Sequence, residues 1–118
     1  MAKRLTDDQI KQYHSDGYVH PVAVLSDEEV REARAAIEAF EAKSGKLFDY
    51  PEKSKSYLLF DWADRLVRHP AVLDAVEDLI GPDIMLYHNI AWLKNPGEDS
   101  YVSWHQDNTY FGHTPCDV

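Results

Sequence analysis

The chain has 118 residues, enough for one domain, and its 21 acidic against 12 basic residues give a net charge of −9. This excess of negative charge argues against binding to nucleic acid or to an anionic membrane surface. No apolar run reaches transmembrane length, the N-terminus lacks the apolar stretch of a secretory signal, and a single cysteine excludes a disulfide within the chain. We therefore expect a single soluble, cytoplasmic domain over residues 1–118.

The first quarter of the chain carries two strong signals for helix starts. Thr6 followed by Gln9, and the same spacing at residues 26–29, are capping boxes, in which the first and fourth residues bond each other's backbone. Gly17 is expected to end the first helix. The segment at residues 18–25 is rich in β-forming residues, but its proline restricts it to an edge or short strand.

The second predicted helix should run to about Lys43 and end near Gly45. Its apolar residues recur at helical spacing, so that one face is available for packing; they are Val30, Ala33, Ile37 and Phe40. Residues 46–56 show no period and are expected to form a loop. An apolar cluster follows at residues 58–62.

A further helix is predicted to begin at Pro70 and to run to Ile80, because proline suits the first turn of a helix. Gly81, followed by a second proline, should end it sharply. Five apolar residues are expected to form its buried side: Val72, Leu73, Val76, Leu79 and Ile80.

The character of the chain then changes from helical over residues 1–80 to β over residues 83–118. Residues 84–93 predict a long strand, residues 95–98 a turn and residues 101–105 a second strand. Helices first and strands after predict an α+β fold. Two strands cannot close a barrel and are barely stable alone, so we expect them to need partner strands.

His105 and Asp107 are the strongest candidates for chemistry. Two residues apart on an extended segment, they face the same way and supply two of the three ligands of the facial triad that holds iron in non-haem oxygenases. Trp104 before them, with Tyr110 and Phe111 after, would furnish apolar surroundings that exclude water. The other histidines are interpreted as surface, loop or packing residues: His14, His20, His69, His88 and His113.

The chain resembles the phytanoyl-CoA dioxygenase family over nearly its whole length. The most specific part is the block at residues 103–111, Ser-Trp-His-Gln-Asp-Asn-Thr-Tyr-Phe. Four further stretches resemble the family in the expected order: residues 5–10 with 16–19, residues 55–60, residues 81–84 and residues 94–97.

This resemblance implies an Fe(II)- and 2-oxoglutarate-dependent dioxygenase that uses O2 to hydroxylate an unactivated C–H bond in a small organic substrate. It implies a double-stranded β-helix, the cupin-like jelly roll, with the N-terminal helices packed on its first strands and the barrel incomplete in this chain. His105 and Asp107 match the family's first two iron ligands. A facial arrangement leaves adjacent positions on the metal for cosubstrate and oxygen.

The resemblance also suggests contacts to 2-oxoglutarate. Lys53 or Lys55 lies where a family lysine can reach the cosubstrate, and a solvated loop lysine is the alternative for each. Ile90 aligns with a position that lines the cosubstrate, whereas Tyr87 and Asn89 are polar candidates of the opposite parity. Which set faces the interior depends on strand register, because a slip of one residue reverses the two faces.

The family's second histidine ligand, and the arginine that pairs with 2-oxoglutarate, have no match here, and His113 lies too soon after the motif to replace that histidine. We therefore expect the chain to be an N-terminal portion of such an enzyme, inactive alone. One alternative is a non-catalytic module whose exposed sheet edge serves as a binding or assembly surface. Another is two copies that complete one barrel, with an iron ligand from His88 or His113; the oligomeric state is left open.

Overall fold

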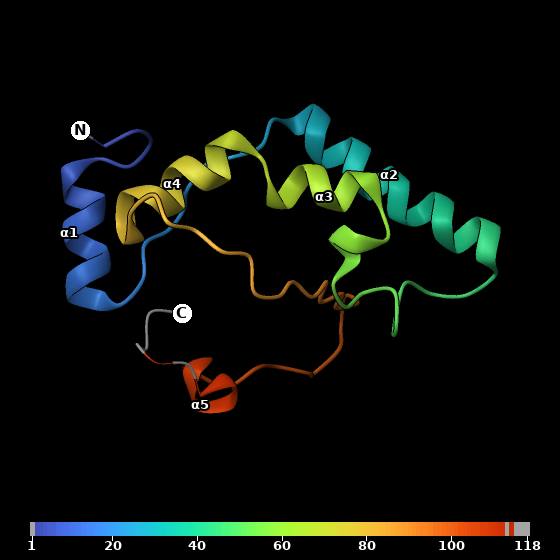
Figure 1. Cartoon of the computed structure of the whole chain (residues 1–118). Coiled ribbons are helices and arrows are strands. Elements are labelled where there is room, and N and C mark those ends of the chain that lie inside the picture. The colour runs from blue at the N-terminus through green and yellow to red at the C-terminus, as the bar shows by residue number, and fades with distance from the viewer. Residues whose placement is uncertain (1, 113, 115–118) are drawn as a thin grey trace.

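The computed structural model describes residues 2–112 and 114. Its helices are α1 (Asp7–Asp16), α2 (Asp27–Ser44), the 3-10 turn η1 (Ser56–Leu58), α3 (Asp61–Val67), α4 (Pro70–Ile80) and the short α5 (Asn108–Phe111) (Figure 1). α1 packs on α4, and α3 packs on both α2 and α4. Within the described residues, no helix is both long enough and apolar enough to cross a membrane.

Both predicted capping boxes are confirmed. The Thr6 hydroxyl accepts from the Gln9 backbone N–H at 3.2 Å, and the Gln9 side chain accepts from the Thr6 N–H at 2.9 Å. Ser26 and Glu29 make the same pair of bonds at the start of α2. α1 ends before Gly17 and α2 before a second glycine, both in the left-handed conformation that lets the chain leave a helix.

α4 also begins and ends where predicted, and a histidine connects its start to α2. The His69 Nδ1 accepts the Ala71 backbone N–H at 3.2 Å, so the ring proton lies on Nε2, which donates to Glu29 at 3.0 Å. The bonds that Glu29 accepts from Ser26, and then from His69, lower the pKa of its carboxyl group to about 2. One residue thus caps α4 and holds the starts of two helices together.

The best-packed part of the molecule is an aromatic cluster between α2, α3 and the loop that joins them. Its ring centroids lie 5.4–6.0 Å apart, and it consists of Phe40, Phe48, Phe60 and Trp62. Phe48 is 3% exposed and Ala63, on α3, is 2% exposed. The sequence identified apolar residues here but not η1 and α3 as helices.

The predicted buried side of α4 is only partly buried. Ile80 is 53% exposed, and none of the other four residues reaches full burial. The expectation of a buried face was wrong for Ile80, because the described residues leave a cavity beside this part of α4.

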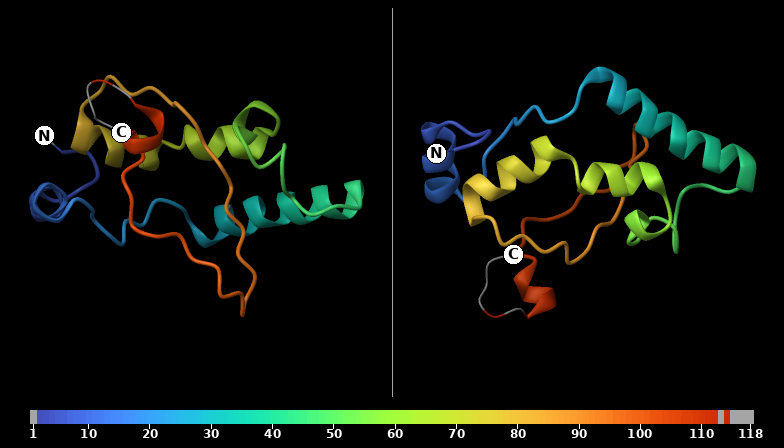
Figure 2. Two further views of the ribbon diagram at one scale, coloured as in Figure 1. Left: turned by 90° about the horizontal axis from the view of Figure 1, so that it is seen from below. Right: turned by 45° about the horizontal axis from the view of Figure 1, so that its top comes forward.

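Residues 83–107 leave α4 as an extended chain, run beneath the helices and return in an open loop to α5 (Figures 1 and 2). The two strands expected at residues 84–93 and 101–105 are not formed in the described part of the chain, and residues 18–25 form none either. Within residues 2–112 and 114, a β-bridge joins Ser54 and Ile90 and no other pair. Residues 108–111, expected within the β region, form a helical turn instead.

The physical reason is the lack of a neighbour. A strand satisfies its backbone through an adjacent strand. Among the described residues, the backbone hydrogen bonds that tie residues 83–107 to the first half of the chain run from Lys55 N to Asn89 O at 2.8 Å and from Ala91 N to Lys53 O at 2.9 Å. The double-stranded β-helix therefore stays a prediction.

Candidate functional site

The structure brings His105 and Asp107 together on one wall of a cavity. The His105 Nε2 lies 3.1 Å from the Asp107 Oδ1, and both side chains are partly exposed. They come from the end of the extended segment, immediately before α5. The cavity has a volume of about 750 Å³. An imidazole nitrogen and a carboxylate oxygen therefore face one space that can hold a small molecule.

A backbone carbonyl orients the imidazole ring. The His105 Nδ1 lies 2.7 Å from the Ser103 carbonyl oxygen, which can only accept, so Nδ1 carries a proton. The Ser103 carbonyl, and then the Asp107 carboxylate, raise the pKa of His105, because both stabilise the imidazolium form. A metal ion would bind through the Nε2 nitrogen, with the Nδ1 bond fixing the ring as in other histidine ligands.

The two residues fit part of an iron site. Imidazole and carboxylate are two of the donors of the 2-His-1-carboxylate triad. Within residues 2–112 and 114, no group of three histidine, cysteine, aspartate or glutamate side chains comes close enough to hold a metal. His88 lines the same cavity without completing such a group. The described residues thus supply two donors, and His113 and Cys116 lie outside them.

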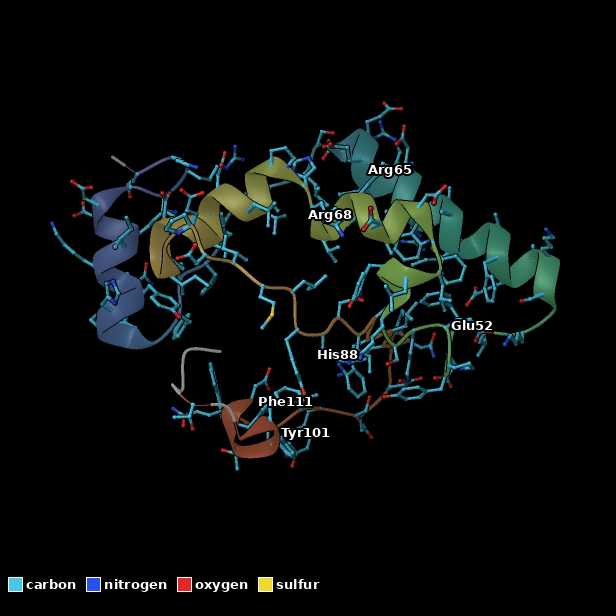
Figure 3. All side chains as sticks on the ribbon, viewed as in Figure 1. Glu52, Arg65, Arg68, His88, Tyr101 and Phe111 are labelled. Atoms are coloured by element: carbon cyan, nitrogen blue, oxygen red, sulfur yellow. The ribbon has the colours of Figure 1, made fainter. Side chains whose placement is uncertain are left out.

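The rest of the cavity is mainly apolar. α4 forms one side, and residues 84–92 form much of the other (Figure 3). Phe111 of α5 also lines it, with its ring centroid 4.9 Å from that of Tyr87. Sequence reasoning missed that the apolar residues of α4 border this space, because an apolar helical stripe predicts packing but not what it packs against. The α4 residues concerned are Val72, Leu73, Val76 and Ile80.

Three of the predicted cosubstrate residues line this cavity: Tyr87, Asn89 and Ile90. Residues with even numbers and residues with odd numbers both border it, because residues 84–90 do not lie in a flat strand with two separate faces. The Asn89 Nδ2 donates to the Ser56 hydroxyl at 2.9 Å, and Ser56 is 1% exposed. The Asn89 Oδ1 is buried without a hydrogen-bond partner among the described residues.

The two predicted lysines do not line the cavity in this structure. The Lys53 ammonium forms an ion pair with Asp49 at 2.7 Å and lies 4.4 Å and 5.2 Å from the ring centres of Tyr50 and Trp92. Lys55 is exposed, and its backbone N–H bonds the Asn89 carbonyl oxygen.

Comparison with known proteins gives a family and two curated relatives. Residues 13–117 match the phytanoyl-CoA dioxygenase (PhyH) family. The chain is 26% identical to a probable alpha-ketoglutarate-dependent hypophosphite dioxygenase of Stutzerimonas stutzeri, over 93% of the chain and 44% of that protein. It is 28% identical to the L-proline trans-4-hydroxylase of Streptomyces griseoviridis, over 92% of the chain and 43% of that protein.

The chain thus spans less than half the length of the curated relatives it matches. No solved structure matches it significantly. The family match covers most of the sequence and includes the segment that carries His105 and Asp107. The chain belongs to the phytanoyl-CoA dioxygenase family.

Proposed function

We propose that the chain is part of an Fe(II)- and 2-oxoglutarate-dependent dioxygenase that hydroxylates an unactivated C–H bond in a small organic substrate in the cytoplasm. The observation that carries the proposal is the approach of the His105 Nε2 to the Asp107 Oδ1 on the wall of the cavity. Two relatives named as a dioxygenase and a hydroxylase support it.

Iron, 2-oxoglutarate and O2 would together supply the oxidant for the C–H bond. His105 and Asp107 would bind the metal, and the Ser103 carbonyl would hold the imidazole ring at the required angle. Metal binding requires the Nε2 of His105 to carry no proton. The apolar walls from α4 and residues 84–92 would limit water around the site.

Tyr87, Asn89 and Ile90 are proposed to line the cosubstrate, since they border the cavity that His105 and Asp107 share. Lys53 would reach it only after leaving Asp49, whereas Lys55 is exposed and is the other candidate. In this proposal, the third metal ligand and the arginine that the family uses to pair with 2-oxoglutarate come from outside the described residues. The 118-residue chain alone should therefore bind iron weakly and release little succinate.

The decisive experiment measures metal binding by the isolated chain under anaerobic conditions, with Fe(II) followed by calorimetry. His105→Ala and Asp107→Ala should each weaken binding about tenfold or more, because each removes a direct ligand. His88→Ala is the matched control, since His88 lines the same cavity outside the pair. Equal binding by all variants would contradict the proposed site.

A second assay adds 2-oxoglutarate, ascorbate and O2 and measures succinate. Low turnover by the chain, with metal binding that depends on His105 and Asp107, would agree with a site completed elsewhere. Robust turnover would contradict a site that has to be completed outside the 118-residue chain.

One observation favours a second candidate function, an assembly surface. Large apolar side chains are strongly exposed in the second half of the chain: Met85 at 84%, Tyr101 at 86% and Trp104 at 92%. Exposed apolar groups of this kind mark interaction sites. A mass that rises with concentration in light scattering, without any effect of metal, would support this function over catalysis.

A further inference from the structure

One carboxylate on α4 holds three consecutive backbone groups of the N-terminal segment. The Asp78 Oδ1 accepts the Lys3 N–H at 2.7 Å, and its Oδ2 accepts the N–H groups of Arg4 and Leu5 at 2.7 and 2.8 Å. Hydrogen bonds to an ionised acceptor are roughly twice as strong as neutral ones. The bonds from Leu5 and Lys3 lower the pKa of the Asp78 carboxyl group.

The side chains of the same segment add further contacts. The Lys3 ammonium forms an ion pair with Glu77 at 2.6 Å and lies 3.9 Å from Asp74, so it reaches two more carboxylates of α4. The Arg4 guanidinium donates to the Ala23 carbonyl oxygen. Residues 3–5 are therefore fixed both to α4 and to the segment that follows α1.

Leu5 is the buried residue of this arrangement, at 5% exposed. It lines a second cavity of about 400 Å³, bordered by α1, residues 18–24 and α4. Figure 1 shows the N-terminal segment beside α1 and the end of α4. Two α4 residues, Val72 and Val76, border both this cavity and the one that His105 lines. α4 is thus a shared wall between the N-terminal segment and the candidate site.

We propose that residues 3–5 form a strap, held on α4 by the three backbone hydrogen bonds to Asp78, which we call the clasp. The strap sets the position of α4, and so of the wall that α4 contributes to the His105–Asp107 cavity. The strap precedes residues 13–117, the stretch over which the family match was found. The proposal is independent of iron binding, since it concerns the packing of α4.

The clasp is tested by amide hydrogen exchange in the 118-residue chain with Asp78→Asn. This substitution keeps the shape of the side chain, removes its charge and replaces one acceptor oxygen by a donor. The amides of Lys3, Arg4 and Leu5 should exchange about tenfold faster or more, as expected for loss of hydrogen bonds to a charged group. Asp74→Asn is the matched control, because Asp74 lies near the Lys3 ammonium and accepts none of the three backbone N–H groups that bond Asp78, so it should change these rates little.

Amides in the middle of α2 report on the whole molecule, since α2 is not part of the clasp. If they keep their rates in Asp78→Asn while the three strap amides exchange faster, the clasp is supported. Trypsin cleavage after Lys3 and Arg4 should accelerate in the same variant. Unchanged exchange of the three amides in Asp78→Asn would overturn the clasp.

The connection to the cavity is tested separately by methyl resonances of Ile84 and Ile90, which line the first cavity but not the second. They should shift in Asp78→Asn and stay in place in Asp74→Asn. Strap amides that are released without any change in the two methyl resonances would overturn the role of the strap in positioning the cavity wall.

Discussion

The helical region at residues 2–82 and the extended region at residues 83–107 both contain large apolar residues, but they bury them to different degrees. In the helical region, Phe48 and Ala63 are almost fully buried. In the extended region, Tyr101 and Trp104 are almost fully exposed, although both are large apolar residues. Helices satisfy their backbone groups internally, whereas an extended segment needs neighbouring strands. The first region can therefore order its core locally, and the second depends on partners.

Hydrogen bonds connect the two regions between residues 53–56 and residues 89–91. The bridge between Ser54 and Ile90 and the partly buried hydrogen bond from Asn89 to Ser56 attach the extended segment to the region before α3. This attachment places residues 84–92 opposite α4 and so forms the cavity. The candidate site thus lies between a helical region that satisfies its own backbone hydrogen bonds and an extended region that needs neighbouring strands to do so.

The largest expected effect is on the free energy of unfolding, when one large aromatic residue in each region is replaced by alanine. Phe48→Ala should lower the free energy of unfolding by about 3 kcal/mol, because it removes a buried ring from the aromatic cluster. Trp104→Ala, at an exposed position, should change it by less than about 0.5 kcal/mol. Urea denaturation measures both. Similar losses for the two variants would show that Trp104 is buried in solution.

The next largest effect concerns the attachment between the regions. Ser56→Ala should destabilise the chain by about 2 kcal/mol, because it leaves the Asn89 Nδ2 without its acceptor in a buried place. Amide exchange at Lys55 and Ala91, whose N–H groups cross between the regions, should accelerate. Ser100→Ala, on the exposed loop, is the control. Slow exchange at both amides in Ser56→Ala would mean that the bridge does not depend on this bond.

A smaller effect is expected at a helix start inside the first region. Ser26→Ala should cost about 1 kcal/mol, since it removes the N-cap of α2. Ser103→Ala, where only the backbone carbonyl is used, should have a negligible effect on unfolding. Thermal unfolding followed by circular dichroism compares the two. Equal stability of Ser26→Ala and the unchanged chain would contradict a stabilising role for the cap.

The smallest expected effect is a pH dependence carried by Glu29. Its folded pKa of about 2 lies below the usual 4.5, so its ionised form stabilises the folded chain above pH 4.5, and this contribution is lost as the pH falls toward 2. The carboxylate is 41% exposed, so solvent screens part of the effect. The stability difference between the unchanged chain and Glu29→Gln should shrink over this range. A difference that stays constant from neutral pH to pH 2 would contradict this assignment.

The sequence predicted the helical half well, because its signals are local. Thr6, Ser26 and Pro70 mark helix starts by bonds or dihedral angles within a few residues, and Gly45 marks an end by its left-handed conformation. α3 was not predicted, because its seven residues offer too few turns for a clear period. The strands were predicted from residue type alone, which says nothing of whether a neighbouring strand is present.

For the candidate site, the sequence by itself determined the pair: His105 and Asp107 lie two residues apart, and the family match includes them. Only the tertiary structure decided what surrounds this pair. In the tertiary structure, apolar residues of α4 line the cavity. Asn89 donates a hydrogen bond to Ser56, and Lys53 forms an ion pair with Asp49. The reason is that ligand spacing is a local property of the chain, whereas a cavity wall is made by segments that meet only after folding.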